Sequence, residues 1–131
     1  MKLINKNLLD KVTSEAKESC RLRMNYNFHD SLNAPCQRLL NALEPGTAVP
    51  IHRHKHTSET YILLRGKLKM MFYNDKKEVI DESILSIEAG NYGIHIPAGV
   101  WHSMDVLASG TVIFETKDGP YMPIQECDIL K

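Results

Sequence analysis

Four side chains in the middle of the chain have the types and the spacing of a metal site. His52 and His54 lie two residues apart, so in an extended strand both imidazoles point to the same face. Glu59 comes five residues after His54, and this odd spacing requires a turn or bulge, for which the polar residues 55–58 are suited. His102 stands at the start of a later predicted strand. Three imidazoles and one carboxylate can bind a divalent transition metal and still leave coordination positions open.

These residues belong to two spaced patterns that carry a family resemblance. The first pattern is Gly46-x5-His52-x-His54-x4-Glu59-x6-Gly66, and it resembles the first cupin motif at every position. The second is Pro97-x-Gly99-x-x-His102, and it resembles the core of the second cupin motif. The second motif departs at two places: Gly90 lies one residue further from the proline than usual, and Val106 stands where asparagine is frequent. Neither departure removes a metal ligand.

Other assignments of the histidines are weaker. His56 also lies two residues from His54, but a His54/His56 pair leaves only two residues before Glu59 and fits the motif less well. A single His-x-His pair is often no more than two surface histidines in a loop. The ordered series of glycines and ligands favours the metal site over that alternative.

The cupin resemblance implies the fold class and the domain organisation. It covers about residues 36–117 and implies an all-β fold, a double-stranded β-helix or jelly-roll barrel with the metal in its mouth. We expect a single cupin domain over residues 1–131. Residues 1–20 would hold a short N-terminal α-helix, about 21–117 the β-barrel, and 118–131 a C-terminal tail.

A narrower resemblance extends over nearly the whole chain. Residues 20–25 with His29, residues 50–54 and residues 114–121 are similar to the WbuC family of cupin-fold metalloproteins. That family is associated with bacterial surface-polysaccharide gene clusters. Sugar-nucleotide isomerases and epimerases are neighbouring cupins, so the resemblance implies sugar chemistry by analogy.

Polar and apolar residues alternate strictly over residues 21–29, which predicts a strand. Its polar face consists of Arg21, Arg23, Asn25, Asn27 and His29. Two placements are open: this face meets water on an outer strand, or it looks into the barrel mouth. In the second case Arg23 and Asn25 would bind phosphate or sugar hydroxyls. His29 would then be a candidate general acid or base, because its ordinary pKa lies near neutrality.

A second group of candidates lies on the last predicted strand, residues 111–117. Glu115 and Lys117 share a face, and they either pair with each other or reach the pocket. Glu115 is the second candidate base. We predict Lys117 and Tyr121 as further substrate-binding residues.

The remaining elements position these candidates. Residues 5–19 predict one helix, capped by Asn5 or Asn7, with an apolar stripe that packs on the barrel or on a second subunit. Further strands are predicted at residues 37–43, 59–64, 66–73, 78–88, 93–97 and 101–107.

Composition excludes several classes of protein. The chain has 131 residues, 43% of them hydrophobic, which suits one globular domain. Sixteen basic residues balance sixteen acidic ones, so nothing suggests a nucleic-acid partner, and no stretch is apolar enough to span a membrane. The start of the chain lacks the apolar core of a signal peptide, and three cysteines are an odd count. Both features favour a cytoplasmic protein with reduced thiols.

We therefore expect a metal-binding cupin protein that acts on a sugar or sugar nucleotide, as an isomerase or epimerase, in bacterial surface-polysaccharide metabolism. It would bind one divalent transition metal, and the ligand set does not distinguish zinc, iron, manganese and nickel. It would take a carbohydrate-type small molecule and form a homodimer. The alternatives are a non-catalytic metal-bearing carbohydrate-binding module and an Fe(II)-dependent dioxygenase. A metal that only braces the fold is less consistent with open coordination positions.

Overall fold

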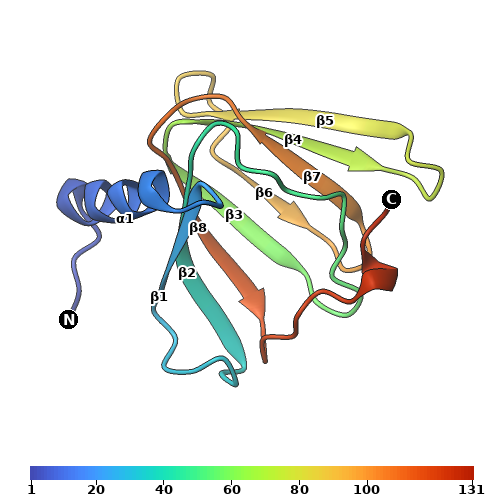
Figure 1. The fold of residues 1–131 in the computed structure, drawn as a ribbon, viewed down its shortest axis with the longest axis horizontal. Helices are drawn as coiled ribbons and strands as arrows, with labels where there is room; N and C mark the ends of the chain where they lie inside the picture. Colours follow the sequence, from blue (N-terminus) through green and yellow to red (C-terminus); the bar gives the residue numbers. More distant parts are fainter.

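The computed structural model describes residues 1–131, which form one α-helix, eight β-strands and one short 3-10 helix (Figure 1). Their bounds are α1 Lys6–Glu18, β1 Arg23–Asn27, β2 Cys36–Leu43, β3 Glu59–Arg65, β4 Lys67–Tyr73, β5 Val79–Ser86, β6 Gly93–Ile96, β7 Trp101–Val106, β8 Thr111–Asp118 and η1 Glu126–Asp128. Every predicted helix and strand is confirmed, with ends that shift by a few residues. The segment 78–88 contains one strand.

The strands form two antiparallel sheets. The larger sheet has the order β1-β2-β8-β3-β6, and the smaller has the order β5-β4-β7. The chain passes from one sheet to the other at the β3–β4 connection, around Gly66. Gly66 has a φ of +92°, and a Cβ there would lie 2.2 Å from the Thr111 hydroxyl. The last glycine of the first motif is therefore required where two strands of different sheets meet.

The main core lies between the two sheets and follows the alternation of the strands. Leu68 and Met70 of β4 are completely buried, and they pack with Leu43 and Ile113 of the larger sheet. Every second residue of a strand points into this core. The other residues of the larger sheet, such as Leu40, point to its outer face.

Helix α1 covers that outer face, beside β1, β2 and β8 (Figure 1). Its buried residues Leu8, Leu9, Val12 and Ala16 form the predicted stripe, and they pack on Leu40, Ala42 and Val112. The helix is thus confirmed as packing on the barrel. It has 13 residues, and no helix of the chain is long and apolar enough to cross a membrane.

Asn5 is the cap of this helix: its side-chain oxygen accepts a hydrogen bond from the Leu8 backbone N–H at 3.0 Å. Replacing Asn5 with alanine is expected to lower the free energy of unfolding by about 1 kcal/mol, because that N–H loses its partner. Urea denaturation followed by circular dichroism measures the change. Asn7→Ala is the control, since Asn7 lies inside the helix and caps nothing. An equal loss in both variants would refute the assignment of the cap.

The C-terminal segment returns to the metal-motif region. The backbone N–H of Leu130 donates to the Ile51 carbonyl at 2.8 Å, and the N–H of Arg53 donates to the Asp128 carbonyl at 3.1 Å. The Arg53 guanidinium also forms an ion pair with the Asp128 carboxylate at 3.0 Å and lies over the Trp101 ring. These contacts hold the end of the chain against the His52–His54 segment.

Candidate metal site and its cavity

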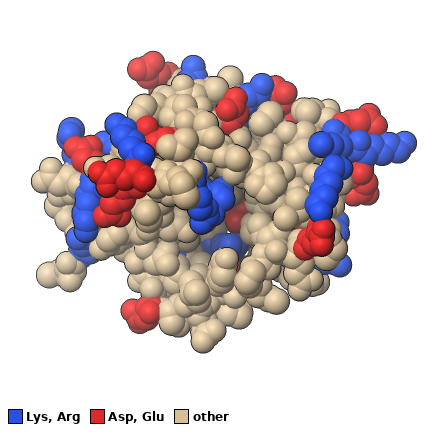
Figure 2. All heavy atoms as spheres, viewed as in Figure 1, with Lys and Arg blue, Asp and Glu red and all other residues tan.

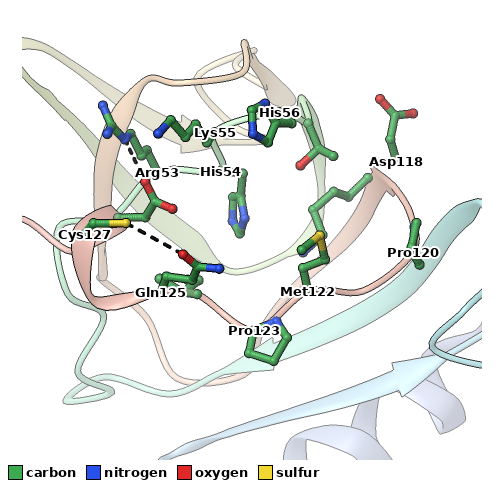
Figure 3. Close-up of a pocket in the computed structure, with 14 residues that line it drawn as sticks. Arg53, His54, Lys55, His56, Asp118, Pro120, Met122, Pro123, Gln125 and Cys127 are labelled. Atoms are coloured by element: carbon green, nitrogen blue, oxygen red, sulfur yellow. Dashed lines mark hydrogen bonds and ion pairs between the residues drawn. The ribbon is translucent and has the colours of Figure 1, made fainter.

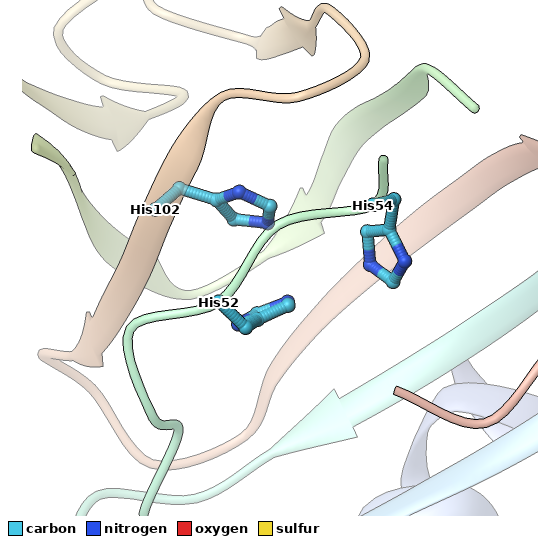
Figure 4. Close-up of side chains that lie close together, drawn as sticks. All are labelled: His52, His54 and His102. Carbon is cyan, nitrogen blue, oxygen red and sulfur yellow. The ribbon is translucent and has the colours of Figure 1, made fainter. Parts of the chain in front are cut away.

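The three predicted histidines come together at one end of the barrel (Figure 4). His52 and His54 lie on the segment before β3, and His102 lies on β7 of the smaller sheet. Backbone hydrogen bonds in both directions, at 3.0 and 2.8 Å, join His52 to His102. One ring nitrogen from each of the three imidazoles lies within 4.8 Å of the other two. This spacing allows all three to reach one ion with small side-chain adjustments.

Backbone carbonyls orient two of the imidazoles. Nδ1 of His52 lies 2.9 Å from the Pro50 carbonyl oxygen, and Nδ1 of His102 lies 2.9 Å from the Val100 carbonyl oxygen. A carbonyl only accepts, so each Nδ1 carries a hydrogen, and in the neutral form of each imidazole Nε2 has the free lone pair. Burial lowers the pKa of His52 to about 4, so this imidazole is neutral at pH 7. Both features are those of a histidine that binds a metal through Nε2.

Glu59 brings the carboxylate to the same place. It is buried at the start of β3, with Oε1 2.9 Å from His54 Nε2 and Oε2 3.4 Å from His102 Nε2. Burial raises the pKa of Glu59, but its contacts with the His102 and His54 imidazoles outweigh burial, so the net pKa lies below its usual range. The hydroxyl of Tyr61 donates a hydrogen bond to Oε2 at 2.8 Å and fixes the carboxylate.

One buried atom tests whether these residues fit a metal. His102 is 1% exposed, and its Nε2 has no hydrogen-bond partner. A buried nitrogen without a partner is costly, and such atoms are rare in folded proteins. The atom faces the other imidazoles and the Glu59 carboxylate, which is where an ion held by this donor set would lie. The three imidazoles therefore fit a divalent transition metal, and the Glu59 carboxylate lies beside them.

A cavity of about 140 Å³ opens beside His52, His54 and Glu59. Ile113 of β8 points into the core, so alternation places Glu115 and Lys117 on the same inner face of the sheet. Glu115 lies opposite Tyr61, and Lys117 lies opposite Glu59, with its Nζ 3.8 Å from Oε1. Both side chains line the cavity, together with Arg23. The space-filling view shows a hollow near the centre of this face, with lysine or arginine atoms in it (Figure 2).

Glu115 has the ionisation behaviour of a proton-transfer group. It is 8% exposed, and burial raises the pKa of its carboxyl to about 7, with the negative charge of Glu59 acting in the same direction. A carboxyl group with a pKa near the working pH can both accept and release a proton. Perturbed carboxyl groups in clefts are frequent at functional sites.

The predicted substrate-binding residues of β1 lie in two different places. The inner face of β1 is the polar one, because Arg23 lies opposite Leu43, a core residue. Of the predicted residues on this face, Arg23 lines the metal cavity. Asn25 is exposed and lines the neighbouring hollow instead.

His29 and Tyr121 lie outside the metal cavity. His29 follows the end of β1, and its Nδ1 lies 3.0 Å from the backbone nitrogen of Arg38. Its side chain is buried against the Arg38 backbone and is not among the residues that line the cavity, so its position does not favour a role in proton transfer there. Tyr121 is 46% exposed, and its ring lies 5.8 Å from Nζ of Lys117.

A second cavity of about 240 Å³ adjoins the first beneath the C-terminal segment (Figure 3). His54 points into it, and both His54 and Lys117 line the two cavities. Met122, Pro123 and Gln125 form the opposite wall. The last residues of the chain, which have no regular sequence pattern, thus enclose one side of the metal site.

Sequence reasoning did not single out Tyr61 and Asn41, which also line the metal cavity. Tyr61 shares the inner face of β3 with Glu59 and Leu63. Its spacing of two residues from the predicted ligand Glu59 is the sequence signal that could have identified it. Asn41 interrupts the apolar strand β2, and such an interruption in a core strand is a signal of the same kind.

Three solved structures illustrate the fold, each at low sequence identity. The cupin domain of Schizosaccharomyces pombe Cnp3 is 11% identical, with a TM-score of 0.58 over 73% of this chain and 64% of that chain. The capsular polysaccharide assembling protein CapF from Staphylococcus aureus is 20% identical, with a TM-score of 0.64 over 80% of this chain and 28% of that chain. A putative sugar phosphate isomerase from Acidithiobacillus ferrooxidans is 20% identical, with a TM-score of 0.58 over 74% and 59%.

The chain spans less than two thirds of each of these three structures, and the likeness establishes the fold. A comparison with curated proteins finds no match. Residues 4–85, more than half of the chain, match a family described as a domain of unknown function (DUF6016). The chain belongs to this family, DUF6016, and its fold is that of a cupin.

Proposed function

We propose that this protein is a metal-dependent sugar isomerase or epimerase that moves a proton on the carbon next to a carbonyl group. The observation that supports it is the placement of the buried Glu115 carboxyl in the same small cavity as His52, His54 and Glu59. The ligands would hold the metal, and Glu115 would supply the proton transfer. A divalent ion held by these ligands would supply Lewis-acid chemistry, which polarises a carbonyl group and stabilises negative charge on its oxygen.

Each cavity residue has a role in this proposal. Glu115 accepts the proton from the carbon next to the carbonyl and returns it to the neighbouring carbon from the same face, while the hydroxyl proton passes to the former carbonyl oxygen. Epimerisation would need a second proton donor on the opposite face. Lys117 and Arg23 donate hydrogen bonds to the oxygens of the substrate and orient it. Tyr61 holds the Glu59 carboxylate through the 2.8 Å hydrogen bond and thereby keeps the ligand in place.

The wider setting is proposed by analogy. Two of the similar structures are named for capsular polysaccharide assembly and for sugar phosphate isomerisation, and the WbuC resemblance points the same way. We propose a role in bacterial surface-polysaccharide metabolism and a cytoplasmic location, which suits three exposed cysteines without disulfides. We also propose a homodimer, because apolar side chains such as Ile80 and Tyr92 are at least 60% exposed.

Proton exchange with solvent tests the catalytic part of the proposal. The metal-loaded protein is incubated in D₂O with a panel of hexoses, hexose phosphates and nucleotide hexoses, and NMR detects deuterium next to the carbonyl carbon. We expect incorporation with at least one member of the panel. Glu115→Gln is expected to slow it by about 100-fold or more, because the amide cannot accept the proton.

Glu78→Gln is the matched control, because Glu78 is exposed in the β4–β5 turn, far in sequence from every cavity residue. Metal content is measured for both variants, so a lost ligand cannot be mistaken for a lost base. Saturable binding of a sugar without any exchange would contradict the enzyme proposal. It would favour the carbohydrate-binding module instead.

A further inference from the structure

The metal cavity adjoins a hollow beside β1, where two arginines stand without acidic partners. Arg23 and Asn41 line both the metal cavity and a neighbouring hollow of about 340 Å³. Arg21 and Asn25 line this second hollow as well. Arg23 and Asn41 therefore border both the metal cavity and the hollow that Arg21 lines.

Arg23 differs from the other partly buried arginines of the chain. Arg53 forms an ion pair with Asp128 at 3.0 Å, and Arg65 forms one with Asp10 at 2.6 Å. Arg23 has no carboxylate within 4 Å, and its guanidinium makes a single long contact of 3.5 Å with the Ala48 carbonyl oxygen. Burial lowers the pKa of Arg23, and the positive charge of Arg21 lowers it further. An unpaired and partly buried guanidinium beside a second one is unfavourable unless an anion joins them.

The backbone that carries this pair is held in a strained conformation. Leu22, between the two arginines, has a φ of +55°, which a branched side chain rarely adopts. The Thr47 hydroxyl donates to the Arg21 carbonyl at 2.7 Å, and the Glu44 backbone N–H donates to the Leu22 carbonyl at 3.0 Å. Strain of this kind persists where the surrounding contacts fix it, and it is frequent at binding sites. The backbone that carries the two arginines is thus fixed by these contacts.

Asn41 supplies a second, independent sign of a ligand. Its side-chain oxygen is buried and has no hydrogen-bond partner. Buried oxygens of this kind normally accept a hydrogen bond. A hydroxyl group of a ligand between Arg23 and the metal site would satisfy it.

We propose that Arg21 and Arg23 form a subsite for an oxyanion of the ligand, a phosphate or a carboxylate group, while the hydroxyl-bearing part of the ligand lies against Asn41 and the metal. The substrate class is then a phosphorylated or acidic sugar and not a neutral one. The forked guanidinium groups suit the paired oxygens of either anion. This inference rests on the proposed function, because it places the ligand in the same cavity.

Calorimetric titration of the metal-loaded protein tests the subsite. The probes are inorganic phosphate, glucose 6-phosphate, glucuronate and glucose, at low ionic strength. We expect an anionic probe to bind at least tenfold more tightly than glucose, and Arg23→Ala to weaken that binding at least tenfold. Arg23→Lys should restore part of the affinity, since it keeps the charge and loses the fork. The stronger of glucose 6-phosphate and glucuronate identifies the anion.

Arg38→Ala is the matched control, because Arg38 is an exposed arginine of β2 that lines neither hollow. The inference is overturned if Arg38→Ala weakens anion binding as much as Arg23→Ala does, or if Arg23→Ala changes nothing. Elemental analysis of the same samples separates this outcome from the fate of the proposed function. Binding that depends on Arg23 in a protein without metal would support the subsite and contradict the metal-dependent enzyme. Bound metal without Arg23-dependent binding of the anion would contradict the subsite and leave the metal-dependent enzyme supported.

Discussion

Replacing His102 with alanine is expected to weaken the binding of a divalent metal by about 100-fold or more. His102 is the only predicted ligand from the smaller sheet, and its Nε2 is buried without a hydrogen-bond partner. Loss of outer-sphere support alone typically costs 10- to 100-fold in metal affinity, so loss of a ligand should cost at least as much. Titration in competition with a chromogenic chelator measures the affinity.

His95→Ala serves as the control for this prediction. His95 is exposed on β6, where its Nδ1 lies 2.9 Å from the Thr60 hydroxyl, and it belongs to no metal site. Its replacement should leave the affinity within about twofold. If His102→Ala binds metal as tightly as the wild type does, the site is wrongly assigned. A folded variant, checked by circular dichroism, is required for either conclusion.

The second large effect is on stability, in protein freed of metal by a chelator. Glu115→Gln is expected to raise the free energy of unfolding by roughly 2–3 kcal/mol at pH 8 and to change it little at pH 4. Burial raises the pKa of Glu115 from 4.5 to about 7, so the folded state holds this proton more tightly than the unfolded state. As pH rises from 4.5 through 7, Glu115 ionises in the wild type and a buried negative charge forms. The free energy of unfolding of the wild type therefore falls over this range. The amide remains neutral throughout.

Urea unfolding at several pH values follows this difference, and Glu78→Gln provides a flat reference. Glu78 is exposed in the β4–β5 turn and lines neither cavity. A gain for Glu115→Gln that is the same at pH 4 and pH 8 would contradict ionisation as its cause. It would indicate a packing effect of the amide.

The metal ligands could be predicted from sequence because they obey local rules. The spacing of His52 and His54 requires only that a strand alternates, and the odd offset of Glu59 requires only a turn. The structure has that turn at residues 55–56, before β3 begins at Glu59. The strands themselves were predictable from alternation, since one face of each meets a core.

The cavity beyond the ligands depends on which sheet face each strand turns inward, and alternation alone does not decide that. The polar side of residues 21–29 could face water or the barrel, and only the pairing of Arg23 with Leu43 places it inward. Residues of this polar face also differ in position: Arg23 lines the cavity, whereas β1 ends before His29, which does not line it. Glu115, which the sequence favours less than His29 as a base, lies at the centre of the larger sheet and reaches the cavity.

The contribution of the C-terminal segment could not be predicted for a different reason. Its contacts with Ile51 and Arg53 join residues about 75 positions apart, through backbone hydrogen bonds that leave no periodic pattern. The ion pair of Arg53 with Asp128 is likewise a long-range pair. Such contacts are set by tertiary structure.

Metal content of the untagged wild-type protein is the most direct test of the site. The protein is incubated separately with zinc, iron(II), manganese and nickel, desalted and examined by elemental analysis, beside a variant with both His52 and His102 replaced by alanine. We predict close to one equivalent of at least one metal in the wild type and almost none in the variant. Wild-type protein that retains none of the four metals would contradict the account, since its three imidazoles and Glu59 would then hold no ion.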